Sequence, residues 1–371
     1  MESQAIHELD AFGQSVWLDN IGRSMIRTGR LRSLIDLGLR GMTSNPTIFD
    51  KAIASGPDYD DQIRSLRRGG ASAFEIYDEL TTTDVRDAAD VFRPVHDRTG
   101  GLDGFVSLEI NPKLADDAAG TIVEGLRLFR KVGRPNVMFK VPATGAGFEA
   151  IEELTAAGVN VNTTLIFSTR QYRATAQAYL RGAKRLAGRR EDLKRVRSVA
   201  SVFVSRIDTA VDAILDALAA GGSAAGGKDR AGALKGRVAV ANSHLCYADF
   251  RRIFAAEEFR GLGANVQRPL WGSTSTKNPA YSDIKYVEEL IARDTVNTMP
   301  ETTFSAFLDH GRVAEALTPD ASKSEAILAE LATLGISIDD VCDRLLEDGV
   351  RAFDRSLDDL LQTIEKKAGL I

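Results

Sequence analysis

The sequence predicts an α/β protein, a (β/α)8 TIM barrel with a C-terminal helical extension. Three observations lead to this fold class. Short apolar runs alternate with longer helix-like stretches, eight such runs can be counted, and the alternation gives way after residue 300 to a helical pattern. Strands that alternate with helices favour a parallel sheet, and eight such units are the number that closes a TIM barrel.

The eight expected strands are the short apolar runs, which cover residues 15–19, 41–45, 104–110, 137–142, 159–167, 198–206, 237–243 and 268–274. Helix-like stretches such as 114–133 and 168–188 lie between most of them, and Ser168 is placed to cap the second of these. The first unit is less regular. The helical stretch from Asn45 to about residue 98 is long enough to hold more than one helix.

The C-terminal part of the chain reads as helices that pack on the barrel. Residues 322–369 carry apolar side chains at spacings of three and four. We expect residues 1–310 to form the catalytic barrel and residues 311–371 to add C-terminal helices within the same domain. Residues 219–236 are rich in glycine and small residues and are expected to form a mobile surface loop. The GGK triplet in this stretch lacks the spacing of a phosphate-binding loop.

The composition limits the classes of partner. The chain has 371 residues, 44% of them hydrophobic and 27% charged, as in soluble globular proteins. Its formal net charge of −5 argues against a general nucleic-acid binder. No window approaches 18 consecutive apolar residues and the N-terminus does not resemble a signal peptide, so no membrane partner is expected. The two cysteines, Cys246 and Cys342, are expected to be reduced thiols in a cytoplasmic protein.

One residue in the apolar run 137–142 raises a chemical question. Lys140 lies between Phe139 and Val141, and lysine is almost never fully buried unless something pairs with it or uses it. Such a lysine reaches a surface, neutralises a buried carboxylate such as Glu109, or has lost its proton because the surroundings penalise the charge. A neutral amine is the nucleophile that forms Schiff bases with carbonyl substrates.

Polar side chains share one face in most of the expected strands. Residues two apart in a strand point the same way, one face of a barrel strand lies toward the lumen, and active sites sit at the carboxyl ends. The residues expected around one pocket are Asp19, Asn45, Glu109, Lys140, Asn162, Thr164 and Ser201. The same alternation places Thr43 with Asn45, Phe203 with Ser201, and Trp271 with Ser273. Any one of these residues alone is more often structural, but a cluster that contains lysine and carboxylates is a candidate functional site.

Eight segments give the chain its resemblance to transaldolases. They are SVWLDNIGRSMI, GMTSNPTIF, VSLEINP, FKVPATGAG, VNTTLIFS, SVASVFVSRID, RPLWGSTSTKNP and VNTMPETT. They follow the family's order and cover nearly all of the chain, and the C-terminal tail resembles the bacterial branch of similar length. The resemblance implies a class I aldolase-type barrel with neither metal nor organic cofactor. Its substrates would be sugar phosphates of the non-oxidative pentose phosphate pathway. A dihydroxyacetone unit would pass from sedoheptulose 7-phosphate to glyceraldehyde 3-phosphate, giving erythrose 4-phosphate and fructose 6-phosphate.

The resemblance also implies roles for individual residues. Lys140 matches the lysine that forms the Schiff base at C2, and Asp19 matches the acid/base that acts on the C4 hydroxyl. Glu109 and Thr164 match the pair that holds the water of carbinolamine dehydration and hydrolysis. Proton transfer by groups placed in this way is worth roughly 10²–10⁴-fold in rate.

Further matches imply how substrate is held. Asn45, which counts among the expected catalytic residues, and the substrate-binding Asn162 match the amides that hydrogen-bond the dihydroxyacetone hydroxyls. The other expected substrate-binding positions are Thr43, the pocket aromatic Phe203, and the phosphate ligands Ser201, Arg206 and Ser273. The branch best known for structure carries an arginine two residues after that last serine. This chain has Ser275 there, and Lys277 is the candidate replacement for the missing cation. The histidines, His7, His96, His244 and His310, form no pair at metal-ligand spacing, so no metal site is expected.

Other functions compete with transaldolase. A fructose 6-phosphate aldolase shares the barrel and the lysine but releases free dihydroxyacetone; such relatives are usually much shorter and place a different polar residue near the water. Glu109 and the length of the chain favour transaldolase. A phosphosugar-binding barrel without catalysis would be expected to lack Lys140, Asp19 or Glu109, and all three are present. An additional isomerase domain is not expected, because the chain ends about where a transaldolase should. Family members occur as monomers, dimers and larger rings, so a homo-oligomer is left open.

Overall fold

The computed structural model describes residues 4–189, 192–220 and 227–370, which form a closed barrel of eight parallel strands. The strands pair in chain order, and the last pairs with the first. They are β1 (Gln14–Asp19), β2 (Gly41–Thr43), β3 (Phe105–Glu109), β4 (Val137–Pro142), β5 (Val161–Ile166), β6 (Ser198–Phe203), β7 (Gln267–Gly272) and β8 (Thr295–Met299). The predicted (β/α)8 fold class is therefore confirmed.

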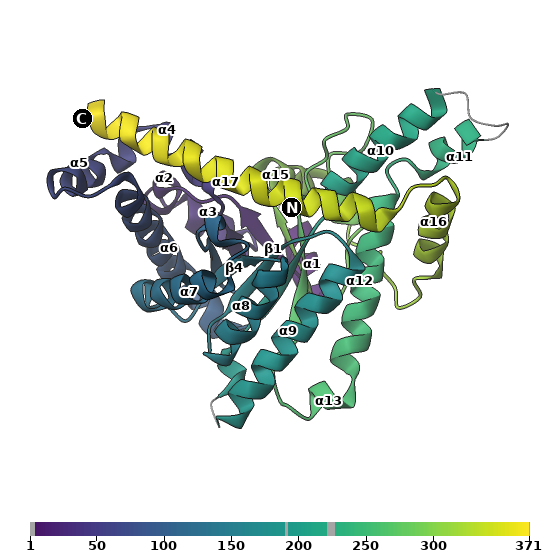
Figure 1. Ribbon diagram of the computed structural model, residues 1–371, viewed down its shortest axis with the longest axis horizontal. Coiled ribbons are helices and arrows are strands. Elements are labelled where there is room, and N and C mark those ends of the chain that lie inside the picture. The colour runs from purple at the N-terminus through teal and green to yellow at the C-terminus, as the bar shows by residue number, and fades with distance from the viewer. Residues whose placement is uncertain (1–3, 190–191, 221–226, 371) are drawn as a thin grey trace.

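Helices connect the strands and cover the outside of the barrel (Figure 1). Those up to β6 are α1 (Gln4–Phe12), α2 (Arg23–Arg27), α3 (Arg30–Asp36), α4 (Pro46–Ala54), α5 (Asp60–Arg68), α6 (Ala73–Arg98), α7 (Ala118–Val132), α8 (Gly145–Ala156) and α9 (Thr169–Gly188). The others are α10 (Ser205–Ala220), α11 (Gly227–Leu234), α12 (Val238–Ala255), α13 (Glu257–Arg260), α14 (Lys285–Glu288), α15 (Glu301–His310), α16 (Ser322–Thr333) and α17 (Ile338–Leu370). Short 3₁₀ turns lie at η1 (Pro57–Tyr59), η2 (Pro112–Leu114) and η3 (Leu193–Arg195).

Two sequence signals for helices agree with the structure. Ser168 caps α9 in a capping box, because its Oγ accepts from the backbone N–H of Gln171 at 3.1 Å while the Gln171 side chain accepts from the backbone N–H of Ser168 at 3.1 Å. The helical stretch that follows Asn45 holds α4, α5 and α6, as its length required.

One predicted strand is wrong. Residues 237–243 begin α12 rather than a strand, and the eighth strand is β8. A short apolar run cannot be told from a buried helix by periodicity alone. α12 packs against α9, α10 and α16, so it is buried on several sides and lacks the polar face that marks a surface helix. β8 was not predicted for the opposite reason, since three of its five residues, Thr295, Asn297 and Thr298, are polar although they are buried.

The predicted loop over residues 219–236 is only partly described. Residues 221–226 lie outside the described residues. Residues Gly227–Leu234 form the helix α11, so for them the loop prediction is wrong. Glycine and alanine content pointed to a flexible segment there, but the contacts of α11 with α10 favour the helical conformation.

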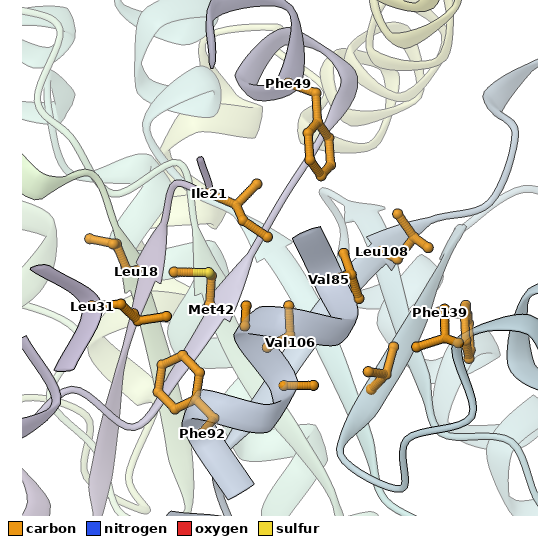
Figure 2. Packing of buried hydrophobic residues seen from close by; sticks show 14 of the residues in the cluster. Leu18, Ile21, Leu31, Met42, Phe49, Val85, Phe92, Val106, Leu108 and Phe139 are labelled. Atoms are coloured by element: carbon orange, nitrogen blue, oxygen red, sulfur yellow. The ribbon is translucent and has the colours of Figure 1, made fainter. Parts of the chain in front are cut away.

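The outer faces of the strands pack against the helices. Figure 2 shows Leu18, Met42 and Val106 from successive strands among side chains from the surrounding helices, including Leu31 and Phe92. All of these are buried. Removing such a side chain from water contributes about 1.5–3 kcal/mol each, so this shell holds the helices against the barrel.

The lumen contains its own apolar layer. Trp17, Phe105, Met138, Val199, Leu270 and Val296 form this cluster. A Cβ atom on Gly41, the residue paired with Trp17 across β1 and β2, would lie 2.5 Å from the indole ring, so only glycine leaves room for the tryptophan. This layer closes the lumen beneath the polar residues at the carboxyl ends of the strands.

The amino-terminal end of the barrel is closed by a buried ion pair. Arg268 Nη1 lies 3.1 Å from Asp103 Oδ1, and their side chains are 7% and 2% exposed. Ser15 Oγ donates to Asp103 Oδ2 at 2.7 Å, and Arg268 Nη2 donates to the carbonyl of Thr295 at 2.7 Å. The pair thus ties together the starts of β1, β7 and β8 at the end of the barrel opposite the predicted site.

The long helix α17 crosses the molecule above the barrel (Figure 1). It contacts α4, α10, the η2 turn and β5, and these are segments near the carboxyl ends of β2, β6, β3 and β5. Polar contacts fix it, including Thr363 Oγ1 to Asp50 Oδ1 at 2.6 Å and Lys113 Nζ to Asp358 Oδ1 at 2.6 Å. Within the described part of the chain, no helix is long and apolar enough to span a membrane.

Candidate active site

A cavity of about 160 Å³ lies at the carboxyl ends of the strands. It is lined by Asp19, Thr43, Asn45, Lys140, Thr164, Ser201, Phe203, Arg206, Leu270, Gly272, Ser273, Ser275, Lys277, Thr298, Pro300 and Phe353. The structure thus brings together every sequence-predicted site residue except Glu109 and Asn162, which lie next to this wall. A wider hollow of about 450 Å³ shares only Asp19 with the predicted residues, so the smaller cavity is the candidate site.

Lys140 is buried and paired. Its Nζ lies 2.8 Å from Glu109 Oε2, and the two side chains are 6% and 4% exposed. The two residues are partners across β3 and β4, which places their side chains side by side on the lumen face. Lys140 Nζ also donates to the carbonyl of Ser44 at 3.0 Å. The lysine therefore does not reach the surface, and it both neutralises a carboxylate and lines the cavity.

Asp19 stands beside this pair. Thr43 Oγ1 donates to Asp19 Oδ1 at 2.7 Å and lies 2.8 Å from Thr298 Oγ1. Burial raises the pKa of Asp19, against the opposing effects of Lys140 and Thr43. Burial also raises the pKa of Glu109, against the charge of Lys140. One lysine is thus flanked by two carboxyl groups that take up protons more readily than usual, a pattern common at catalytic sites.

The amides predicted near the donor fragment differ in position. Asn162 bridges two strands below the cavity wall, donating from Nδ2 to Ser107 Oγ at 3.0 Å and accepting from Ser201 Oγ at 2.6 Å. Asn45 lines the cavity and also caps α4, since its Oδ1 accepts from the backbone N–H of Ile48 at 3.0 Å. Its amide nitrogen remains the group that can donate to a ligand.

Thr164 owes its place to an irregular strand. The pairing of β5 with β6 shifts register between Thr163 and Ile166, and Leu165 has a φ of 57°. A positive φ is unusual for leucine and marks local strain that surrounding packing must hold. Thr164 faces the cavity, and its buried Oγ1 has no hydrogen-bond partner among the described residues. The hydroxyl is therefore free to bind a water or a ligand.

The far side of the cavity is cationic. Arg206, in the first turn of α10, lies with its guanidinium carbon 5.4 Å from the centre of the Phe203 ring. Burial lowers the pKa of Arg206, and no ion-pair partner is found for it among the described residues. Lys277 is more exposed and donates to Ser275 Oγ at 2.7 Å. Such a pair of cations beside hydroxyl groups can bind an anion.

The alternation predicted for the last segment of the site is wrong at Trp271. Leu270 and Gly272 line the cavity, whereas Trp271 packs in the outer core with the helices. Ser273 nevertheless reaches the cavity because the strand has ended and its φ of 55° turns the chain. Ser273 Oγ lies 3.0 Å from Ser205 Oγ, which links this turn to α10.

Several cavity residues had no clear signal in the sequence. Thr298 lies in β8 and Pro300 comes directly after it. The alternation of apolar and polar residues did not indicate this strand, although the segment VNTMPETT is part of the family resemblance. Phe353 comes from α17, where it reads as an ordinary core position of a helix. Within the described ranges, no group of three or more His, Cys, Asp or Glu side chains could hold a metal ion.

A closed parallel barrel with a charged cavity at the carboxyl ends of its strands defines the molecule as a (β/α)8-barrel enzyme. The Transaldolase/Fructose-6-phosphate aldolase family matches residues 16–364. A transaldolase of Saccharopolyspora erythraea is 44% identical over 367 residues, covering 98% of this chain and 97% of the relative. A transaldolase of Trichodesmium erythraeum is 40% identical over 373 residues, covering 99% and 98%. Transaldolase 2 of Streptomyces coelicolor is 44% identical over 368 residues, covering 98% and 97%. The chain belongs to the transaldolase/fructose-6-phosphate aldolase family, and the resemblance inferred from the sequence is confirmed.

Proposed function

We propose that this protein is a transaldolase that carries a dihydroxyacetone unit as a Schiff base on Lys140. The unit moves from sedoheptulose 7-phosphate to glyceraldehyde 3-phosphate and leaves erythrose 4-phosphate and fructose 6-phosphate, in the pentose phosphate pathway. The observation that carries the proposal is the buried amine of Lys140, 2.8 Å from Glu109 in a cavity that also contains Asp19. Family membership and relatives named transaldolase give the reaction class.

Glu109 supplies the proton transfers of Schiff-base formation in this mechanism. Moving one proton from Lys140 Nζ to Glu109 Oε2, across 2.8 Å, turns the ion pair into a neutral amine and a neutral acid. The raised pKa of Glu109 makes the neutral acid more accessible. The amine then attacks the C2 carbonyl, and Glu109 returns the proton to the carbinolamine oxygen, which leaves as water. Thr164 Oγ1 is the hydroxyl available to hold this water.

Asp19 acts as the base in cleavage. Its carboxylate takes the C4 hydroxyl proton while the electrons of the C3–C4 bond move toward the iminium nitrogen. The aldose phosphate leaves as an aldehyde, and the dihydroxyacetone unit stays on Lys140 as an enamine. In the second half of the reaction the enamine carbon attacks the acceptor aldehyde, and Asp19 gives the proton to the new hydroxyl. Asn45, through its free amide nitrogen, is the proposed ligand of the donor hydroxyls.

The cationic side of the cavity is the proposed phosphate site. Its candidate ligands are Ser201, Arg206, Ser273 and Lys277, and Phe203 supports the guanidinium from one side. Thr43 holds Asp19 in place through its hydrogen bond. Asn162, which bridges strands below the wall, acts by positioning Ser201 rather than by touching sugar.

The rival within the family is a fructose 6-phosphate aldolase, which releases free dihydroxyacetone. The named relatives that match the chain along nearly its whole length are transaldolases, which favours transfer over release. A binding protein without catalysis is not favoured, since Lys140, Asp19 and Glu109 are all present. We place the enzyme in the cytoplasm and leave a homo-oligomer as the quaternary state to be measured by light scattering.

Borohydride trapping tests the proposal. With fructose 6-phosphate, reduction and peptide mass spectrometry should find a dihydroxyacetone adduct on Lys140, and Lys140→Met should abolish it. Lys194→Met is the control for loss of an exposed lysine that does not line the cavity, and the adduct should persist on Lys140 in that variant. Adding erythrose 4-phosphate before the reductant should discharge the adduct. An adduct on another lysine, or none at all, would contradict the proposed mechanism.

A further inference from the structure

We propose that Phe353 of α17 shields the Lys140 intermediate from bulk water and so determines how often the dihydroxyacetone unit is transferred rather than lost. This inference rests on the proposed function. It assigns a role to a residue outside the barrel strands and their loops, for which the sequence pattern gave no signal.

The position of Phe353 in the cavity wall is the first observation. All the other lining residues have numbers of 300 or lower, so Phe353 is the contribution of the C-terminal helix to the site. Its ring centre lies 5.5 Å from Lys140 Nζ, and the residue is 8% exposed. The ring therefore separates the reactive amine from the solvent on the side of α17.

The second observation is that the ring is carried by a helix held on both sides of it. One turn before Phe353, Gly349 packs against Leu165, and a Cβ atom there would lie 2.9 Å from the leucine side chain. One turn after it, Leu357 is buried in the main core. Nearer the start of the helix, Cys342 Sγ donates to the carbonyl of Phe167 at 3.2 Å. A side chain on such a support keeps a fixed place above the lysine.

The chemistry of the intermediate makes such a wall matter. If a proton from solvent reaches C3 of the enamine, the iminium of dihydroxyacetone forms. Water then adds to C2, the C–N bond breaks, and free dihydroxyacetone and the lysine amine are released. A water-excluding apolar ring slows both steps, while an aromatic face tolerates the positive charge of the iminium. The proposed phosphate ligands Arg206 and Ser273 line the same cavity, so an aldehyde phosphate bound there would lie within reach of the intermediate.

The test measures how one intermediate divides between two fates. Fructose 6-phosphate alone gives the rate of dihydroxyacetone release, and added erythrose 4-phosphate gives the rate of transfer. We expect Phe353→Ala to raise the ratio of release to transfer about tenfold or more, and Phe353→Leu to raise it less, because leucine keeps an apolar wall. The ratio does not depend on the fraction of folded enzyme, so a loss of stability does not imitate the effect.

Leu357→Ala provides the matched control. It truncates another buried apolar side chain of α17, one turn away, that does not line the cavity. It should lower the melting temperature but leave the ratio unchanged. An unchanged ratio in Phe353→Ala, or an equal rise in Leu357→Ala, would overturn the role of the ring. Failure of the wild-type enzyme to form a borohydride adduct on Lys140 would instead refute the Schiff-base function itself.

Discussion

At the residue scale, the site is organised by side chains that share a low-dielectric space. Lys140 lies in one buried cluster with the carboxyl groups of Glu109 and Asp19. Burial raises the pKa of each carboxyl group, and the charge of the lysine opposes that rise. Breaking a buried pair by removal of one member leaves an uncompensated charge and is costly. The three side chains of the cluster are therefore interdependent.

The pH dependence of the reaction should reflect the raised pKa of Asp19. As the base of cleavage, Asp19 must be ionised, and its ionised form is lost as pH falls through the raised pKa. We expect kcat/KM for fructose 6-phosphate to decline on the acid side at a pH above about 3.9, the usual pKa of aspartic acid. At pH values above this decline, where the wild type is fully active, Asp19→Asn should lower kcat by roughly 10²–10⁴-fold. A wild-type profile that stays flat down to pH 4, in a protein shown to be folded by circular dichroism, would contradict this assignment.

Arg206 should matter only when the substrate carries a phosphate. A hydrogen bond to a charged group is worth about 1.5–3 kcal/mol, so Arg206→Gln should lower kcat/KM for fructose 6-phosphate about tenfold to a hundredfold. The same variant should leave the slower reaction of unphosphorylated fructose nearly unchanged. Arg237→Gln is the control for loss of one positive charge, because Arg237 is exposed and its side chain donates to the backbone carbonyl of Ala233 at 3.2 Å. Equal losses with both sugars would show that Arg206 does not bind the phosphate.

The residues around the cavity could be predicted where a strand is regular. The alternation of residues along β1, β3 and β4 places Asp19, Glu109 and Lys140 on the lumen face of their strands. The parallel pairing of β3 with β4 then sets Glu109 beside Lys140. Prediction fails where the backbone departs from a regular strand. Ser273 lines the cavity through a left-handed turn while Trp271 points outward, and no periodic pattern contains that turn. Phe353 arrives from a distant helix, and only the tertiary packing places it there.

At the scale of elements, one predicted strand is a helix and one observed strand, β8, was not predicted, which shows the limit of local sequence patterns. Residues 237–243 have the apolar character of a strand but lie in a helix that is covered on several sides. β8 has buried polar residues whose partners lie elsewhere, such as Asn297, which accepts from Thr274 Oγ1 at 3.0 Å. Both errors arise because burial depends on neighbours that sequence order does not show.

The hydrogen-bonded contact between α10 and α12 should make the free energy of unfolding depend on pH. Asp208 accepts from the backbone N–H of Ala239 at 2.7 Å and from the Tyr286 hydroxyl at 2.8 Å. Burial raises its pKa from 3.8 to about 6, so its contribution to stability is fully present below about pH 4 and is lost as pH rises through about 6. A difference of about two in pKa corresponds to roughly 3 kcal/mol.

The variant Asp208→Asn should remove this dependence. Between pH 4.5 and 7.5, the free energy of unfolding of the wild type should fall relative to that of the variant by up to about 3 kcal/mol. Urea unfolding at the two pH values measures the difference. Asp216→Asn, an exposed position on the same helix, is the control and should follow the wild type. A constant gap between Asp208→Asn and wild type would show that Asp208 has an ordinary pKa in the folded protein.

At the scale of the whole molecule, the two ends of the barrel differ in role, since one holds the candidate active site and the other a buried ion pair. The carboxyl end holds the cavity under α17, while the amino end is closed by Asp103 and Arg268, with an apolar layer between them. The alternating pattern was sufficient to predict the barrel, and the late helical pattern to predict that helices pack on it. The division into residues 1–310 and 311–371 stays a prediction. The sequence could not indicate that α17 lies over the mouth, because its apolar stripe would fit any face of the barrel.

The buried ion pair at the amino end should affect stability without affecting catalysis. Arg268→Met leaves the Asp103 carboxylate buried, and its remaining donors among the described residues are Ser15 Oγ at 2.7 Å and the Trp17 indole N–H at 3.2 Å. Loss of one partner of a buried pair costs about 3–5 kcal/mol, and replacing both partners costs less. We therefore expect Arg268→Met to lower the free energy of unfolding by about that amount, and Asp103→Asn combined with Arg268→Met to recover part of it. The rate per site, with folded sites counted by borohydride trapping on Lys140, should stay within about twofold of the wild type, because the apolar layer separates the pair from the cavity. A variant that keeps its stability but loses turnover would show that the two ends of the barrel are coupled.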